Sequence, residues 1–149
     1  MMRQIEGRCH CGNIQFKFLW PSLEAEIPVR VCGCSFCTRH NGTYTSHPNA
    51  RLTVEIADKS LVNKYVFGTK TAEFHICARC GVVPFVTSKI DGHEYGVVNV
   101  NTFENVRALQ LRSSVSDFEG EALADRLQRR KRTWIPDITI SIAREGRSD

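Results

Sequence analysis

The sequence predicts a mainly β protein with one short helix near its C-terminus. Short runs in which apolar and polar residues alternate are typical of half-buried strands. Three such runs are Ile14, Phe16 and Phe18; Leu52, Val54 and Ile56; and Ile138, Ile140 and Ile142. Between them lie segments rich in β-branched and aromatic residues, bounded by turn signals such as FGT and IDGH. A strand-rich fold built from antiparallel sheets follows.

The remaining elements are predicted in chain order. Further strands are expected at 62–67, 72–76, 82–86 and 94–100. A helix is expected over residues 116–132, where Ser116 and Glu119 have capping-box spacing, although Gly120 weakens the opening turn. Acidic residues crowd its start and basic residues its end, as the helix dipole favours.

Length and composition predict a single domain spanning residues 1–149. The chain has 149 residues, 42% hydrophobic and 24% charged, and no apolar run long enough for a membrane span. The start, MMRQIEGRCHCG, lacks the apolar stretch of a signal peptide, so we expect a cytoplasmic protein with reduced thiols. The net charge of +4 does not by itself call for nucleic acid as a partner.

Seven cysteines in a reducing compartment indicate metal ligation, because an odd number fits poorly with paired disulfides. They form three clusters: Cys9-His10-Cys11-Gly12, Cys32-Gly33-Cys34-Ser35-Phe36-Cys37, and Cys77-Ala78-Arg79-Cys80-Gly81. In the first and third clusters a glycine follows the second cysteine. Glycine permits the positive-φ turn that aims N–H groups at sulfur, which is typical of a zinc knuckle.

The two glycine-ended clusters together supply four ligands for a structural zinc, namely Cys9, Cys11, Cys77 and Cys80. This site would tie the N-terminal strand to the middle of the chain. The alternative for Cys9 and Cys11 is a pair of unligated thiols on a strand.

Cys32, Cys34 and Cys37 then remain as three ligands with one open position, the arrangement of catalytic zinc sites. A substrate thiol bound there would lose its proton and become a nucleophile at neutral pH. The alternative is a second structural site closed by a histidine, for which the candidates are His10, His40, His47 and His75.

Several basic residues allow more than one interpretation. Arg39 and His40 could offset the negative charge of the three thiolates, or could be ordinary surface residues of a loop. The run RLQRRKR, 126–132, is interpreted as a solvated helix end rather than a nucleic-acid patch, and pairing with an anionic small molecule is a third interpretation. His75 is two residues from Cys77 and is interpreted as a core or surface residue rather than a partner of the metal site.

Three ordered motifs, GRCHCGNIQF, CGCSFCTRHNG and FHICARCGVVPF, resemble the glutathione-dependent formaldehyde-activating enzymes, a family that includes centromere protein V. The resemblance spans residues 7 to about 103. It implies a small β-tent fold, a structural zinc on Cys9, Cys11, Cys77 and Cys80, and a more labile zinc on Cys32, Cys34 and Cys37. The activity it implies is carbon–sulfur bond formation or cleavage between glutathione and formaldehyde.

The middle motif departs from the family pattern at two places. Gly33 stands where a histidine is common, and Thr38-Arg39 keeps only one base of the usual basic pair. These changes leave the sulfur ligands intact. They affect what the resemblance implies about the identity of the substrate.

Two hypotheses follow from the sequence. The first is a zinc-dependent carbon–sulfur lyase that joins or releases an aldehyde and a small-molecule thiol such as glutathione, with Cys32, Cys34 and Cys37 at its catalytic site. The second is a zinc-stabilised binding module without catalysis, using a surface such as the basic C-terminal helix.

Overall fold

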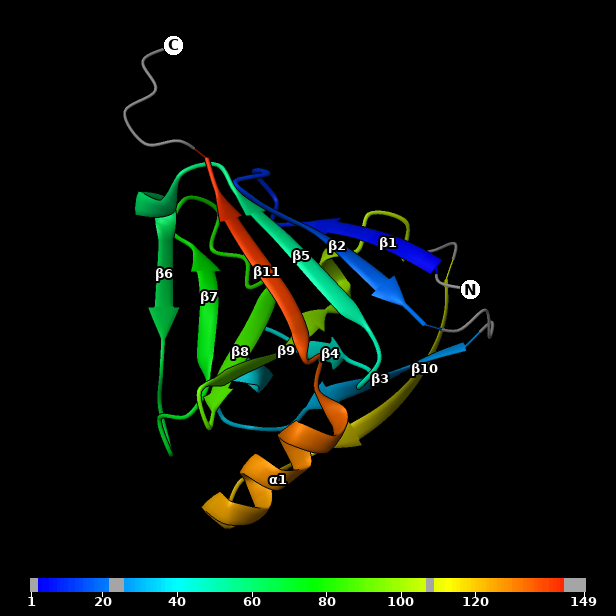
Figure 1. The fold of residues 1–149 in the computed structure, drawn as a ribbon, viewed down its shortest axis with the longest axis vertical. Coiled ribbons are helices and arrows are strands. Elements are labelled where there is room, and N and C mark those ends of the chain that lie inside the picture. The colour runs from blue at the N-terminus through cyan, green and yellow to red at the C-terminus, as the bar shows by residue number, and fades with distance from the viewer. Residues whose placement is uncertain (1–2, 22–25, 107–108, 144–149) are drawn as a thin grey trace.

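The computed structural model describes residues 3–21, 26–106 and 109–143. In these ranges the chain forms eleven strands, one α-helix and three short 3-10 helices (Figure 1). Their bounds, in chain order, are β1 (Arg3–Arg8), β2 (Ile14–Trp20), β3 (Glu26–Cys32), η1 (Cys37–Arg39), β4 (Thr43–Thr45), β5 (Arg51–Ile56), η2 (Lys59–Leu61), β6 (Val62–Tyr65), β7 (Glu73–Cys77), β8 (Phe85–Ile90), β9 (His93–Asn99), η3 (Val100–Thr102), β10 (Gln110–Ser116), α1 (Leu123–Thr133) and β11 (Asp137–Ile142). The predicted mainly β class with one helix is confirmed.

The strands form two sheets. The smaller sheet has the order β1-β2-β5-β11, and the larger has the order β10-β3-β4-β9-β8-β7-β6. Neighbouring strands are antiparallel, except that β11 runs parallel to β5 and β10 runs parallel to β3. Figure 1 shows β1, β2, β5 and β11 side by side, with α1 leading directly into β11.

The main core joins residues of the smaller sheet, such as Phe18 and Leu52, to residues of the larger sheet, such as Phe85 and Val98. All four side chains are fully buried. Phe103 stacks on Phe18 with ring centroids 6.2 Å apart. Burial of these side chains supplies most of the driving force that holds the two sheets together.

A second core cluster lies on the other face of the larger sheet. Successive residues of a strand point to opposite faces, so Phe85 and Val98 join the main core while Val86 and Val97 join the second cluster. Trp134, directly after α1, belongs to this second cluster. Strands β8 and β9 are therefore buried on both faces, and the helix covers part of the second face.

The three alternating runs form strands β2, β5 and β11, as predicted, and 62–67, 72–76, 82–86 and 94–100 overlap β6 to β9. The expected half-burial is wrong for the end of β11, where Ile140 and Ile142 are 36% and 45% exposed. This strand pairs with β5 at one edge of the smaller sheet.

The predicted helix start is wrong. Ser116 ends strand β10, and the helix begins at Leu123 with Ala122 as a cap that makes no side-chain hydrogen bond. Ser116 instead pairs with β3 in a parallel ladder, and its carbonyl accepts a hydrogen bond from the N–H of Gly33 at 2.6 Å. Long-range sheet pairing thus overrides the local cap signal. Within the described ranges, no helix has the length and apolarity needed to cross a membrane.

Candidate functional site: two cysteine clusters and a cavity

The sulfur atoms of Cys9, Cys11, Cys77 and Cys80 lie within 4.8 Å of one another. The Cys9 and Cys11 sulfurs are 3.8 Å apart, and the Cys11 and Cys77 sulfurs 3.5 Å. Four sulfurs at about 2.3 Å from a tetrahedral zinc stand roughly 3.8 Å from one another. The donor set and its spacing therefore fit a tetrahedral metal ion.

Both loops of this cluster are built alike. The N–H of Cys9 donates to the carbonyl of Ile14 at 2.9 Å, and the N–H of Cys77 donates to the carbonyl of Val82 at 3.0 Å. The glycines that end the two motifs have positive φ, +85° for Gly12 and +81° for Gly81. L side chains rarely adopt this conformation, which explains why glycine stands at both positions.

Backbone N–H groups stabilise negative charge on these sulfurs. Burial raises the pKa of Cys9 to about 12, although the N–H of Ile14 donates to its sulfur at 3.3 Å. Burial also acts on Cys80, but hydrogen bonds from the backbone of Cys11 and Val82 lower the pKa of that thiol to about 6. Hydrogen bonds of this kind offset the charge that four thiolates bring to a metal ion.

The sulfurs of Cys32, Cys34 and Cys37 form a second group, also within 4.8 Å of one another. Among the described residues, no histidine, aspartate or glutamate ligand atom joins it. The ring of His40 instead contacts Phe36, with centroids 4.5 Å apart. The described part of the chain therefore brings three sulfur donors together at this point.

A tight loop positions these three cysteines. Cys32 ends β3 and Cys37 opens η1, where its N–H donates to the sulfur of Cys34 at 3.4 Å. The hydroxyl of Tyr44 lies 3.5 Å from the sulfur of Cys37. Gly42 makes room for it, because a Cβ there would stand 2.7 Å from that hydroxyl. The sequence analysis missed Tyr44, and no motif singles it out.

The three thiols differ in pKa. A hydrogen bond with Cys37 lowers the pKa of Cys32 to about 6 and raises that of Cys37. Burial raises the pKa of the Tyr44 hydroxyl, which keeps it protonated beside the sulfur. Cys32 is therefore the thiol that most readily becomes a thiolate, and the Cys37 thiol beside it can donate a hydrogen bond to its sulfur.

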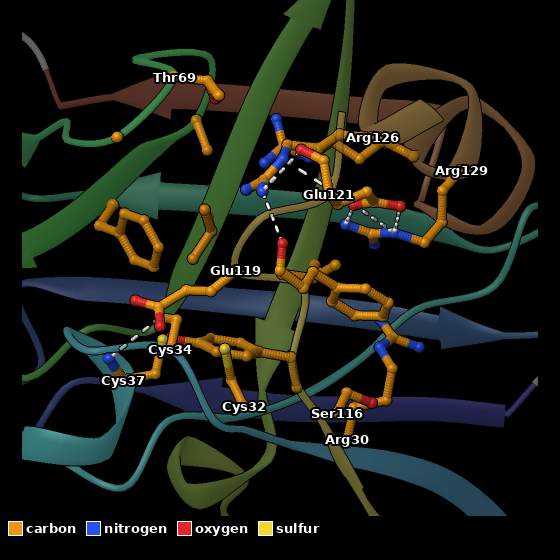
Figure 2. A pocket seen from close by; sticks show the side chains of 18 of the residues that line it. Arg30, Cys32, Cys34, Cys37, Thr69, Ser116, Glu119, Glu121, Arg126 and Arg129 are labelled. Carbon is orange, nitrogen blue, oxygen red and sulfur yellow. Dashed lines mark hydrogen bonds and ion pairs between the residues drawn. The ribbon is translucent and has the colours of Figure 1, made fainter. Parts of the chain in front are cut away.

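The second cysteine cluster borders a cavity of about 500 Å³ (Figure 2). The cavity lies between the cysteine loop, the larger sheet, the 116–121 segment and α1. Its lining includes Cys32, Cys34, Cys37, Tyr44, Phe67, Ala72, Phe74, Val86, Val97, Phe118, Glu119, Glu121, Arg30, Arg126, Arg129, Arg130 and Trp134. By contrast, the lining includes none of the four cysteines of the first cluster.

Three arginines of α1 face this cavity, so their interpretation as a solvated helix end is wrong. Arg129 forms a bidentate ion pair with Glu121, with a shortest N–O distance of 3.0 Å. Arg126 lies 3.9 Å from the same carboxylate. The guanidinium of Arg129 also lies 3.6 Å from the ring centre of Phe118. These contacts hold the 118–121 segment against the helix and form one wall of the cavity.

Two of the lining arginines, Arg130 of α1 and Arg30 of β3, have no carboxylate within ion-pair distance among the described residues. Arg130, 6% exposed, donates to the hydroxyls of Thr71 and Ser88 at 2.9 and 3.0 Å. Burial lowers its pKa to about 10. Arg30 donates to the hydroxyl of Ser46 at 3.0 Å, and burial lowers its pKa as well. Both remain cationic at neutral pH and give the cavity positive charge.

The charge that faces the second cluster comes from Arg30 rather than from Arg39 or His40. Arg39 is exposed and donates to the carbonyl of Ser35, and His40 is exposed as well. Arg30 and Cys32 attract each other electrostatically. Arg30 lies two residues before Cys32 on β3, and period-2 alternation was the signal that could have placed both on one face.

His75 is a core residue, which agrees with its interpretation from the sequence. It is 3% exposed, stacks on Phe85 with centroids 4.2 Å apart, and shares a hydrogen bond of 2.8 Å with Thr87. Burial lowers the pKa of its imidazole to about 4. The ring therefore stays neutral and takes part in packing.

The fold and the site together define a mainly β protein with two groups of cysteines spaced for metal binding, one of them beside a cavity. The chain matches the glutathione-dependent formaldehyde-activating enzyme family over residues 4–120 and belongs to that family. Its relatives are named for an activity on formaldehyde and glutathione. Among solved structures, the chain is similar to a Rhodobacter sphaeroides protein solved by structural genomics. The two are 27% identical, the match covers 67% of this chain and 88% of the other, and the TM-score is 0.49.

Proposed function

We propose that this protein is a zinc-dependent carbon–sulfur lyase that joins or releases formaldehyde, or a related aldehyde, and a thiol such as glutathione. The observation that carries the proposal is the group of three cysteine sulfurs at the edge of a 500 Å³ cavity. Three protein ligands and one position left to an outside donor are typical of catalytic zinc sites. Membership of the formaldehyde-activating family supports the same reaction.

The two clusters take different roles in this proposal. Cys9, Cys11, Cys77 and Cys80 hold a structural zinc that links the β1–β2 turn to the end of β7 within a single domain. Cys32, Cys34 and Cys37 hold the second zinc. When bound there, zinc lowers the pKa of a coordinated substrate thiol, so that the thiol reacts as a thiolate at neutral pH.

The residues around the second cluster bind and orient the substrates. Arg30 and Arg130 hydrogen-bond to hydroxyl groups and have no carboxylate within ion-pair distance among the described residues, so they are suited to the carboxylates of glutathione. Glu121 holds Arg126 and Arg129 in place. Tyr44 contacts Cys37 and fixes the orientation of that ligand.

The reaction is an addition. The sulfur of the thiolate forms a bond to the carbonyl carbon, the C=O π bond opens, and its oxygen takes up the proton that the thiol has lost. The product is a hydroxymethyl thioether of the hemithioacetal type, and the reverse reaction releases the aldehyde. We place the reaction in the cytoplasm, where glutathione keeps thiols reduced.

The alternative of a binding module that uses a basic helix surface gains no support from the site. Arg126, Arg129 and Arg130 line the cavity instead of forming an outward patch. Their charge is thus directed at a small ligand next to the cysteines.

Consumption of formaldehyde in the presence of glutathione tests the proposed function. We expect the purified protein to accelerate the reaction and Cys34→Ser to lose the acceleration. Thr38→Ser, a change of an exposed residue in the same loop, is the control and should keep it. A wild-type protein that holds two zinc ions and leaves the uncatalysed rate unchanged would contradict the proposal.

A further inference from the structure

The cavity beside Cys32, Cys34 and Cys37 has two walls of opposite character. Figure 2 shows Arg30 and Arg129 on one side of the view, and Thr69, Cys34 and Cys37 on the other. One side of the cavity is largely apolar. It is lined by Phe67, Ala72, Phe74, Val86 and Val97, and Trp134 completes it beneath Arg130.

Strand register builds the apolar wall. Phe74 on β7 pairs with Val86 on β8, and Val86 pairs with Val97 on β9. Paired residues of neighbouring strands lie on the same face of a sheet, so these three side chains form one continuous row. Ala72, just before β7, belongs to the same cluster and has the smallest side chain of this wall.

The apolar wall reaches the cysteine loop directly. Phe36, between Cys34 and Cys37 in the sequence, lies 4.9 Å from the ring of Phe74, and Phe67 lies 5.5 Å from both rings. Cys32 and Cys34 pack against the same cluster. A molecule that approaches these sulfurs from the cavity therefore has apolar surface beside it.

Neither formaldehyde nor glutathione accounts for this wall. Formaldehyde has no substituent, and its two heavy atoms need a small part of 500 Å³. Glutathione is a peptide with two carboxylates, an ammonium group and two amides, which match the arginine side. Desolvating such polar groups against phenylalanine and valine is unfavourable. The apolar side of the cavity therefore matches neither of these two substrates.

We propose that the aldehyde substrate carries an apolar side chain, aromatic or of several carbons, that binds between Phe67, Phe74, Val86 and Val97. This inference rests on the proposed lyase function and names its electrophile. The thiolate sulfur bonds to the carbonyl carbon of this larger aldehyde, and the carbonyl oxygen gains the proton. The carboxylates of the thiol bind at Arg30 and the aldehyde substituent binds on the aromatic side, with the reacting atoms at the cysteines.

A comparison of aldehydes with glutathione as the common thiol tests the inference. The probes are formaldehyde, acetaldehyde and phenylacetaldehyde, and the readout is kcat/KM, each divided by the uncatalysed rate constant. We expect the ratio for phenylacetaldehyde over acetaldehyde to be about tenfold or more, the scale on which apolar pockets discriminate. Binding of 2-phenylethanol, an unreactive alcohol with the same side chain, is measured in parallel by calorimetry.

Two variants fill the apolar side, Ala72→Phe from the segment before β7 and Val97→Phe from β9. Either should lower the phenylacetaldehyde-to-acetaldehyde ratio by about tenfold and abolish binding of 2-phenylethanol. Ala57→Phe adds the same side chain at an exposed position away from the cavity and is the matched control. Zinc content and thermal unfolding show that each variant is folded.

The outcomes separate this inference from the function on which it rests. Acceleration with formaldehyde, together with a phenylacetaldehyde-to-acetaldehyde ratio of one or less, overturns the inference and leaves the lyase function. No catalysis with any aldehyde overturns the proposed function, while 2-phenylethanol binding that Ala72→Phe abolishes would still establish the apolar subsite. A wild-type protein that does not bind 2-phenylethanol overturns the subsite.

Discussion

The two cysteine clusters differ in the number of their sulfurs and in their surroundings. Four sulfurs meet where two glycine turns close on each other, and the main core packs against them. Three sulfurs meet at a loop beside a cavity lined with arginines and aromatic rings. Burial alone does not separate the clusters, because Cys9, Cys77 and Cys37 are all at most 1% exposed. Ligand count and access from the cavity decide which cluster can accept a ligand from outside.

The largest effects should come from removing one sulfur from each cluster. Cys77→Ser removes a ligand of the proposed structural zinc, and structural zinc contributes about 10–16 kcal/mol in zinc-finger peptides. That amount is comparable with the whole stability of a domain, about 5–15 kcal/mol. We expect Cys77→Ser to be largely unfolded by circular dichroism.

Cys34→Ser should leave the fold nearly unchanged, because the loop's backbone hydrogen bonds remain, and should lose activity. Thermal unfolding, zinc content and formaldehyde consumption measured on both variants compare the clusters. If Cys34→Ser unfolds as readily as Cys77→Ser, the division into a structural and a catalytic cluster is wrong.

The grouping of the seven cysteines into a set of four and a set of three could be predicted from the sequence because its signals are local. Cysteine spacing and the following glycines depend on a few neighbouring residues, and the turn at Gly12 forms as they require. The cavity depends on pairing between distant segments. Strand β10 pairs with β3, and Glu121 and the arginines of α1 then line the same cavity as Cys32. The local pattern of acidic residues followed by basic residues instead favours a solvated helix end, and it contains no signal for the cavity that this long-range pairing forms.

A smaller effect is expected from Arg30→Ala, which removes positive charge beside the three-cysteine cluster and tests whether that charge binds the thiol substrate. Charge-assisted hydrogen bonds contribute about 1.5–3 kcal/mol, so kcat/KM for glutathione should fall about tenfold or more. The uncharged thiol 2-mercaptoethanol should be affected much less, because it has no carboxylate to lose. Arg51→Ala, which removes an exposed arginine paired with Asp137 on the smaller sheet, is the matched control. Equal losses for both thiols would show that Arg30 acts on the fold and not on the ligand.

The smallest effect should come from Gly12→Ala. Its Cβ meets no atom closer than 3.6 Å, so the cost is the strain of positive φ, about 1–2 kcal/mol. Gly92→Ala has the same strain, with φ at +80° and open space around it, but no sulfur nearby. Both variants should lose similar stability in denaturant unfolding. Only Gly12→Ala should release zinc faster from the four-cysteine cluster. Equal zinc release from the two variants would remove the proposed role of the glycine turns.

Stepwise removal of zinc with a chelator, followed together with activity and circular dichroism, tests the central claim most directly. The account predicts two zinc ions per chain. A mild chelator should remove one of them with loss of activity, leaving the fold intact, and added zinc should restore activity. The second ion should leave only as the chain unfolds. A single zinc ion per chain, or two ions that leave together as the protein unfolds, would contradict the account.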